Sequence, residues 1–89
     1  MTTMALIDPI LKRFRAALDE TYGNRLDRVV LLGSHARGEA GPGSDYDIAV
    51  FLKDPDSFWE ESGRLAEIET DILYDTGAIM NALPFPAGA

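Results

Sequence analysis

The sequence predicts a small α/β (α+β) domain whose elements follow the order helix, strand, strand, helix, strand. In two stretches apolar residues recur every three or four positions, which is typical of amphipathic helices. Three shorter stretches are continuously apolar or alternate between apolar and polar residues, which is typical of strands. With 89 residues and 46% hydrophobic residues, the chain suffices for one modest core, and we expect a single domain over residues 1–89.

The first helix is expected to begin after Asp8, a residue type that caps helix N-termini, with Pro9 in its first turn. It is expected to end before Gly23. Its buried stripe consists of Ile10, Leu11, Phe14, Leu18 and Tyr22.

Two strands are expected to follow this helix. Residues 28–32 form an apolar, partly β-branched run that stops at Gly33, which predicts a central strand buried on both faces. From Asp45 onward apolar and polar residues alternate, so Asp45 and Asp47 lie on one side of the second strand and Tyr46 on the other.

A second long helix is predicted between two local signals. Ser57 and Glu60 match a capping box after the turn at 53–56, and Gly77 is suited to the C-cap. Its buried stripe is formed by Leu65, Ile68 and Ile72.

The third strand is expected over residues 78–84, with Pro84 at its end. The tail 85–89 is expected to be unstructured in isolation. Because the chain stops directly after a predicted strand, we expect longer relatives to continue into further elements, or the sequence to be truncated.

Composition excludes several classes of function. Fifteen acidic and eight basic residues give a formal net charge of −7, which repels a nucleic-acid backbone. The absence of cysteine excludes disulfides, thiolate zinc sites and cysteine nucleophiles. We find no signal peptide or membrane anchor and expect a cytoplasmic protein. So small a core also favours association, either with a copy of the chain or with a partner protein.

The turn after residues 28–32 is suited to binding phosphate. Gly33 lets the backbone approach a ligand without a Cβ in the way, and the N–H groups that follow can bind phosphate oxygens. Ser34 adds a hydroxyl, and Arg37 adds a fork of donors for a polyphosphate. The alternative is an ordinary glycine turn with a surface arginine.

Asp45 and Asp47 are candidate ligands for one or two divalent cations, because carboxylates two positions apart on a strand point the same way. Mg²⁺ is the natural candidate, since it prefers oxygen ligands and shares them with substrate phosphates. The alternative is an exposed strand face with solvated acids.

Two rival sites fail on composition. An EF-hand would place Asp45, Asp47 and Asp56 at positions one, three and twelve, but Val50 stands where that loop requires glycine. A serine hydrolase is poorly supported, because the single histidine, His35, adjoins Ser34 and no nucleophile-elbow motif is present. We therefore interpret His35 as a turn or surface residue.

Taken together, the segments Gly-Ser-His-Ala-Arg-Gly at 33–38 and Ser-Asp-Tyr-Asp-Ile-Ala-Val at 44–50 closely resemble the signature of minimal nucleotidyltransferases in the polymerase-beta-like superfamily. The resemblance extends over about residues 18–83. It implies a small mixed β-sheet flanked by helices. It also implies an antitoxin-like protein whose partner is a helical toxin of the HEPN type.

The resemblance also implies roles for individual residues. Gly33 and Ser34 would hold the β- and γ-phosphates of ATP or another nucleoside triphosphate. Asp45 and Asp47 would be the catalytic ligands of Mg²⁺. The supporting residues of the nucleotide site would be Arg37, Gly38 and Ser44. The implied reaction transfers a nucleoside monophosphate, AMP from ATP, to a hydroxyl group of a protein partner.

The family pattern usually includes a third carboxylate on a later strand, and three residues compete for that position. Asp71 and Asp75 fall in one helical row with Glu67, which favours a solvent-facing position. Asn81 lies on the predicted third strand, but an amide cannot act as a base. The alternative function is therefore a catalytically inactive module that neutralises its partner by contact alone.

Overall fold

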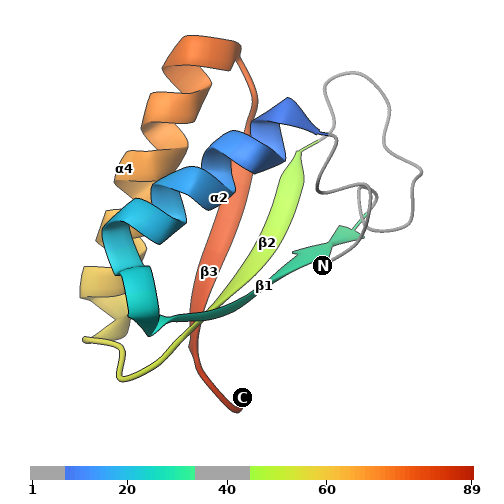
Figure 1. The fold of residues 1–89 in the computed structure, drawn as a ribbon. Helices are drawn as coiled ribbons and strands as arrows, with labels where there is room; N and C mark the ends of the chain where they lie inside the picture. Colours follow the sequence, from blue (N-terminus) through green and yellow to red (C-terminus); the bar gives the residue numbers. More distant parts are fainter. Residues whose placement is uncertain (1–7, 34–44) are drawn as a thin grey trace.

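The computed structural model describes residues 8–33 and 45–89 (Figure 1). The elements are, in order, α2 (Pro9–Tyr22), a short 3₁₀ helix (Gly23–Arg25), β1 (Leu26–Leu32), β2 (Tyr46–Leu52), α4 (Phe58–Thr76) and β3 (Met80–Pro86). The predicted order of helices and strands is confirmed.

The ends of both helices follow the predicted capping signals. The Asp8 carboxylate accepts hydrogen bonds from the first N–H groups of α2, and the Ser57 hydroxyl accepts one from the Glu60 N–H at 3.2 Å. Gly77 ends α4 with a φ of 78°, in the left-handed region that glycine adopts readily. The local sequence alone therefore determined where these helices begin and end.

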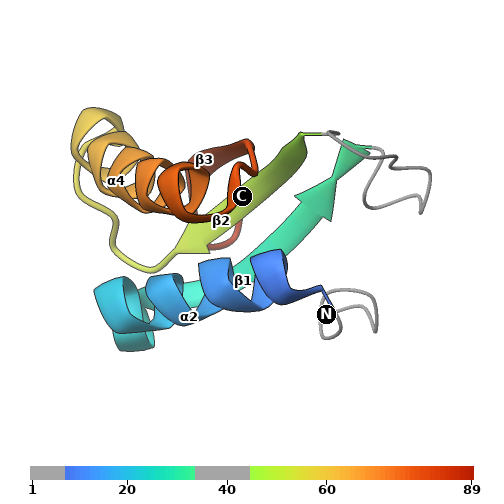
Figure 2. The ribbon, with the colours of Figure 1, turned by 90° about the horizontal axis from the view of Figure 1, so that it is seen from above.

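The sheet is mixed, with β2 in its centre. β1 pairs with β2 in antiparallel orientation, whereas β3 pairs with β2 in parallel orientation. Both helices lie on the same side of this sheet (Figure 2). The expected α+β architecture, a small mixed sheet flanked by helices, is confirmed.

The prediction that residues 28–32 form a central strand is wrong. Within the described part of the chain β1 lies at an edge of the sheet, and its last residue, Leu32, is 45% exposed. An apolar run predicts a strand but says nothing of its neighbours. The chain returns from β2 through α4, and this crossover places β3 on the side of β2 opposite β1.

The third strand also continues past its predicted end at Pro84 and includes the first two residues of the 85–89 tail. Alternate residues of a parallel strand hydrogen-bond to the neighbouring strand. The Ala87 N–H donates to the Leu52 carbonyl at 2.7 Å, so odd-numbered residues of β3 face β2. Pro84 and Pro86 belong to the outward-facing set, where a missing N–H group costs no hydrogen bond in the sheet.

The hydrophobic core lies between the two helices and the sheet face that they cover. The predicted stripes of both helices are buried, except for half-buried Ile10. The buried core residues are Leu11, Phe14, Leu18, Tyr22, Leu26, Tyr46, Ile48, Val50, Leu52, Leu65, Ile68, Ile72 and Met80.

The charged side chain of Glu61 is buried beside these apolar residues. Its carboxylate accepts hydrogen bonds from Arg25 at 2.6 Å, from Arg64 at 2.8 Å and from the Asp56 N–H at 2.8 Å. Glu61 thereby joins the first turn of α4 to the residue that precedes β1.

None of the helices in the described residues has the length and apolar character that a membrane span requires.

Candidate functional site

The sheet face without helices presents three rows of side chains, one residue from each strand. These rows follow from the strand register and consist of Leu32, Asp47 and Asn81, then Val30, Ala49 and Leu83, and finally Arg28, Phe51 and Phe85. The first row is polar on β2 and β3, and the second is apolar. The polar row lies at the end of β2 where the chain enters the sheet.

Gly33 follows β1 directly and lies against this polar row. Its φ is 69°, in the left-handed region. A Cβ added at Gly33 would lie 2.9 Å from Asp47 Oδ2, closer than real Cβ contacts. Its backbone conformation therefore favours glycine here, and a Cβ would in addition force the Asp47 carboxylate to move. This contact joins the predicted phosphate turn to one of the predicted metal ligands.

The two predicted carboxylates converge on a single amide. Asn81 Nδ2 lies 3.4 Å from Asp45 Oδ2 and 3.4 Å from Asp47 Oδ1. Asp45 is exposed and Asp47 half-buried, so both are open to ligands. The alternation that placed these carboxylates on one side of the strand is thus borne out by the geometry. Their roles as catalytic residues and metal ligands stay predictions.

Asn81 lies beside Asp45 and Asp47. The sequence had left Asn81, Asp71 and Asp75 as candidates for this third position. Asn81 pairs with Asp47 in the register of β2 and β3. Asp71 and Asp75 lie on the exposed surface of α4, and Asp75 forms an ion pair with Arg13 of α2. The third side chain beside the carboxylate pair is therefore an amide. The signal in the sequence was its place on the expected third strand.

Tyr46 was assigned to the apolar side of the strand and also has a positioning role. Its hydroxyl donates a hydrogen bond of 2.8 Å to Asp8 Oδ2, the N-cap carboxylate of α2. Burial, and then the hydrogen bond to Asp8, raise the pKa of Tyr46 to about 12. Because Tyr46 stands between Asp45 and Asp47, this bond holds the carboxylate-bearing start of β2 against α2.

Several predicted site residues lie outside the described residues. His35, interpreted as a turn or surface residue, lies there too, and the predicted site residues there are Ser34, Arg37, Gly38 and Ser44. Their assignment to the nucleotide site, like that of Gly33, stays a prediction.

The side chains of Asp45, Asp47 and Asn81 fit a hard divalent cation. Asp45 and Asp47 offer carboxylate oxygens, which Mg²⁺ prefers, and Asn81 offers a neutral amide. Within residues 8–33 and 45–89, no cluster of three or more acidic, histidine or cysteine side chains is suited to a metal ion. The site therefore has two charged ligands and leaves further coordination positions to water or substrate oxygens.

Comparison with known protein families identifies the class of protein to which this fold and site belong. The family described as Nucleotidyltransferase domain matches residues 11–86, which is most of the chain. The chain belongs to this family. The resemblance inferred from the motif at 33–50 is therefore confirmed.

Two relatives come from Methanocaldococcus jannaschii. "Putative protein adenylyltransferase MJ0141" is 38% identical over 45 residues, covering 51% of this chain and 46% of that protein. "Putative protein adenylyltransferase MJ0604" is 32% identical over 73 residues, covering 82% of this chain and 67% of that protein. The chain thus spans about half the length of the first relative and two thirds of the second. No solved structure matches significantly.

Proposed function

We propose that this nucleotidyltransferase domain transfers AMP from ATP to a hydroxyl group of a protein acceptor, with Mg²⁺ as its cofactor. The observation that carries the proposal is the convergence of Asp45 and Asp47 beside Gly33, on the sheet face that the helices leave open. The glycine turn would receive the phosphates, and the carboxylates would hold the cation.

Asp45 and Asp47 would bind Mg²⁺, which when bound neutralises the triphosphate and stabilises the charge of the departing pyrophosphate. In the proposed reaction the acceptor oxygen forms a bond to the α-phosphorus. The bond from that phosphorus to the bridging oxygen breaks, and pyrophosphate leaves. The acceptor proton goes to solvent or to a carboxylate, because the Asn81 amide cannot accept it.

Asn81 has a positioning role in this proposal. Two carboxylates on one side of a strand repel each other, and an amide N–H₂ that faces both offsets part of that repulsion. The side chain thereby supports the pair without adding charge. A site with two carboxylates and one amide binds a divalent cation more weakly than one with three carboxylates.

Two observations support a protein as the acceptor. Both relatives are named for protein adenylylation. Next to the polar row, Val30, Ala49 and Leu83 form an apolar strip on the helix-free face, in which Leu83 is 52% exposed, Val30 half-buried and Ala49 buried. A protein segment that covers this strip could present a hydroxyl group to Asp47. We propose a helical partner of the HEPN type as the acceptor.

A non-catalytic binding module is the second candidate function, and the observation that favours it is the amide at Asn81. Such a module would neutralise its partner without nucleotide. Persistence of neutralisation after loss of both carboxylates would select this candidate.

Intact-mass spectrometry tests the proposal. The protein is incubated with the product of its neighbouring gene, Mg²⁺ and each nucleoside triphosphate in turn. We expect the partner to gain the mass of one AMP residue with ATP. Asp45→Asn/Asp47→Asn should abolish this gain, whereas Asp27→Asn/Asp54→Asn, which removes the same charge elsewhere, should retain it. Full transfer by the Asp45/Asp47 variant would refute the assignment.

A further inference from the structure

The outer face of α4 combines two highly exposed aromatic residues with small residues between them. Trp59 is 83% exposed and Tyr74 is 82% exposed. Helical spacing places Gly63, Ala66 and Thr70 between these rings, on the side of α4 that faces away from the core. Aromatic side chains of this kind are enriched among the residues that dominate binding energy in protein interfaces.

Gly63 has no function within the domain that the structure reveals. A Cβ added at this residue meets nothing within 4 Å, and its φ is not in the left-handed region. Glycine inside a helix lowers its stability relative to alanine. The fold thus tolerates a weaker helix at a position where a side chain would fit, which is expected where another backbone must approach closely.

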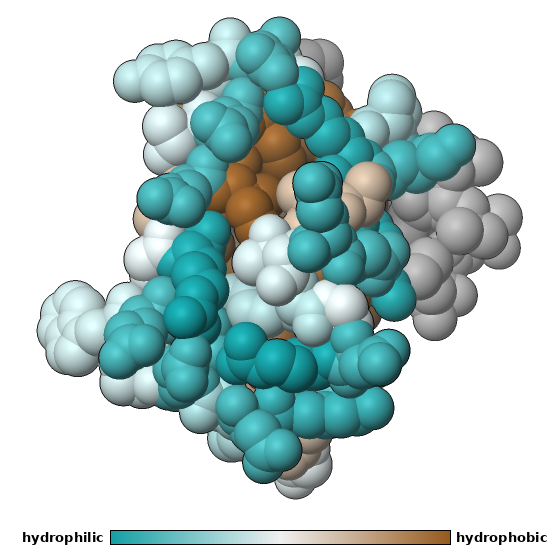
Figure 3. All heavy atoms as spheres, turned by 60° about the vertical axis from the view of Figure 1, so that its left-hand side comes forward, coloured by the Kyte–Doolittle hydropathy of each residue, from teal (hydrophilic) through white to brown (hydrophobic). Residues whose placement is uncertain are grey.

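A shallow hollow of about 380 Å³ lies on this face and is lined by Ala66, Glu67, Thr70 and Asp71. Its two carboxylates have no basic side chain within ion-pair distance in the described residues, whereas Arg13 pairs with Asp75. Figure 3 shows that the side of the molecule carrying both helices is largely hydrophilic, with a small patch of hydrophobic atoms visible between hydrophilic side chains. The outer face of α4 therefore offers two exposed aromatic side chains beside carboxylates that form no ion pair within the described residues.

We propose that the outer face of α4 binds a basic amphipathic helix of another protein. The small residues between Trp59 and Tyr74 leave room for the backbone of a crossing helix, and Glu67 and Asp71 would pair with its lysine or arginine residues. A second copy of this chain is disfavoured, because its net charge of −7 would be brought against the same sign. Nucleic acid is repelled for the same reason.

This docking surface is distinct from the proposed catalytic site at Asp45 and Asp47. α4 packs on the sheet face that carries Tyr46, Ile48 and Val50, whereas the alternation of β2 places Asp45 and Asp47 on the opposite face. A partner bound to α4 would therefore leave the carboxylates accessible. The inference does not depend on transferase activity.

Trp59 makes the proposal directly measurable, because it is the chain's single tryptophan. The probe is a synthetic amphipathic helical peptide of about five turns, roughly 18 residues, with lysines on one face and leucine and alanine on the other. A matched peptide carries glutamates in place of the lysines. We expect the basic peptide to shift Trp59 emission to the blue, with an affinity about tenfold or more above that of the acidic peptide and decreasing with salt.

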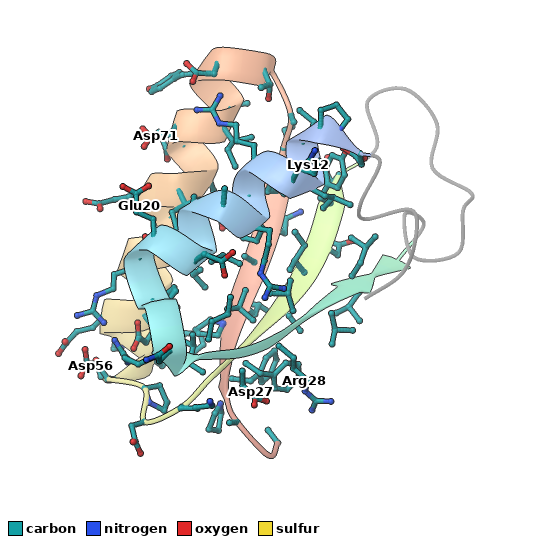
Figure 4. The ribbon with its side chains drawn as sticks, viewed as in Figure 1. Lys12, Glu20, Asp27, Arg28, Asp56 and Asp71 are labelled. Atoms are coloured by element: carbon teal, nitrogen blue, oxygen red, sulfur yellow. The ribbon has the colours of Figure 1, made fainter. Side chains whose placement is uncertain are left out.

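Two variants separate docking from folding. Gly63→Leu fills the space between the rings and should weaken binding about tenfold or more, while thermal stability stays equal or rises because leucine favours helix. Glu67→Gln/Asp71→Asn should weaken binding and its salt dependence. Asp27→Asn/Asp54→Asn is the charge-matched control and should bind normally. Figure 4 shows Asp71 on α4 and Asp27 beside β1 at the other end of the molecule.

Three results would overturn the inference. They are no binding of the basic peptide, equal binding of both peptides, and full binding by a folded Gly63→Leu variant. The measurement contains no nucleotide, so its failure leaves the proposed transfer reaction untouched. Conversely, loss of AMP transfer in the Asp45→Asn/Asp47→Asn variant says nothing against docking on α4.

Discussion

Replacing Glu61 with glutamine tests whether a buried carboxylate holds the start of α4 to the residue before β1. Glu61 is 0% exposed and accepts three hydrogen bonds, two from arginines and one from the Asp56 N–H. Glutamine keeps the shape of the side chain. It loses the charge, and its N–H₂ group must face at least one of the three donors.

The exposure of the two arginines sets the magnitude. The side chains of Arg25 and Arg64 are 37% and 38% exposed, so water can hydrate them when the carboxylate charge is removed. The loss of about 3–5 kcal/mol seen for fully buried pairs is therefore not reached. With its N–H₂ in the place of Oε1, glutamine leaves one donor, Arg64, without an acceptor at about 1 kcal/mol, and loss of the charge weakens the two bonds to Oε2 by about 1 kcal/mol together. We expect Glu61→Gln to lower the free energy of unfolding by about 2 kcal/mol.

Urea denaturation followed by circular dichroism measures this change. Glu60→Gln is the matched control, because Glu60 is the preceding residue, is 62% exposed and lies 4.0 Å from Arg64. It should cost less than about 0.5 kcal/mol. If the two variants lose the same free energy of unfolding, the reasoning about the buried carboxylate is refuted.

Acid pH provides a second test of the same residue. Burial raises the pKa of Glu61. Hydrogen bonds from the Asp56 N–H, Arg64 and Arg25 together lower it by more than burial raises it, so the net pKa lies below the usual 4.5. A carboxyl with a lowered pKa stabilises the fold above its unfolded pKa, and this stabilisation is lost as pH falls. The stability difference between the wild type and Glu61→Gln should therefore shrink below about pH 4.5. A difference that grows on acidification would contradict the assignment.

Three further predictions concern the sheet site. Gly33→Ala should reduce AMP transfer at least about tenfold in the mass assay, and should lower the free energy of unfolding measured in urea by about 1–2 kcal/mol. The reason is that φ is 69° and a Cβ would lie 2.9 Å from Asp47 Oδ2. A fully active variant would contradict this. Asn81→Asp adds a third carboxylate, so Mg²⁺ should raise its melting temperature more than that of the wild type, and an equal response would refute the metal assignment. Tyr46→Phe should cost about 1 kcal/mol by removing the bond to Asp8. Since the pKa of Tyr46 is raised to about 12, this tyrosine favours the fold below pH 10 and loses that effect as pH rises towards 12, so alkali should destabilise the wild type more than Tyr46→Phe.

The two proposals place different functions on the two sides of the molecule. The helix-free face carries the carboxylates of Asp45 and Asp47 and an apolar strip. The outer face of α4 carries exposed aromatic residues and two acids that form no ion pair within residues 8–33 and 45–89. A protein partner that binds α4 and reaches round an edge of the sheet would meet both.

The sequence by itself determined the features that depend on neighbouring residues. Caps at Asp8, Ser57 and Gly77 are local backbone chemistry, and the structure has them as predicted. The common orientation of Asp45 and Asp47 follows from the twofold alternation of a strand. The motif at 33–50 was sufficient to identify the family, because its glycine and its carboxylates are close in the chain.

Only the tertiary structure decided which distant residues meet. The parallel pairing of β2 with β3 put β1 at an edge and brought Asn81 to the carboxylates, 34 residues from Asp47. The same pairing leaves Pro84 and Pro86 facing away from β2, so β3 continues through both prolines. The burial of Glu61 depends on an arginine 36 residues away. Such contacts arise from the packing of helices and strands against one another, and this packing is not encoded in the spacing of residues along any one of them.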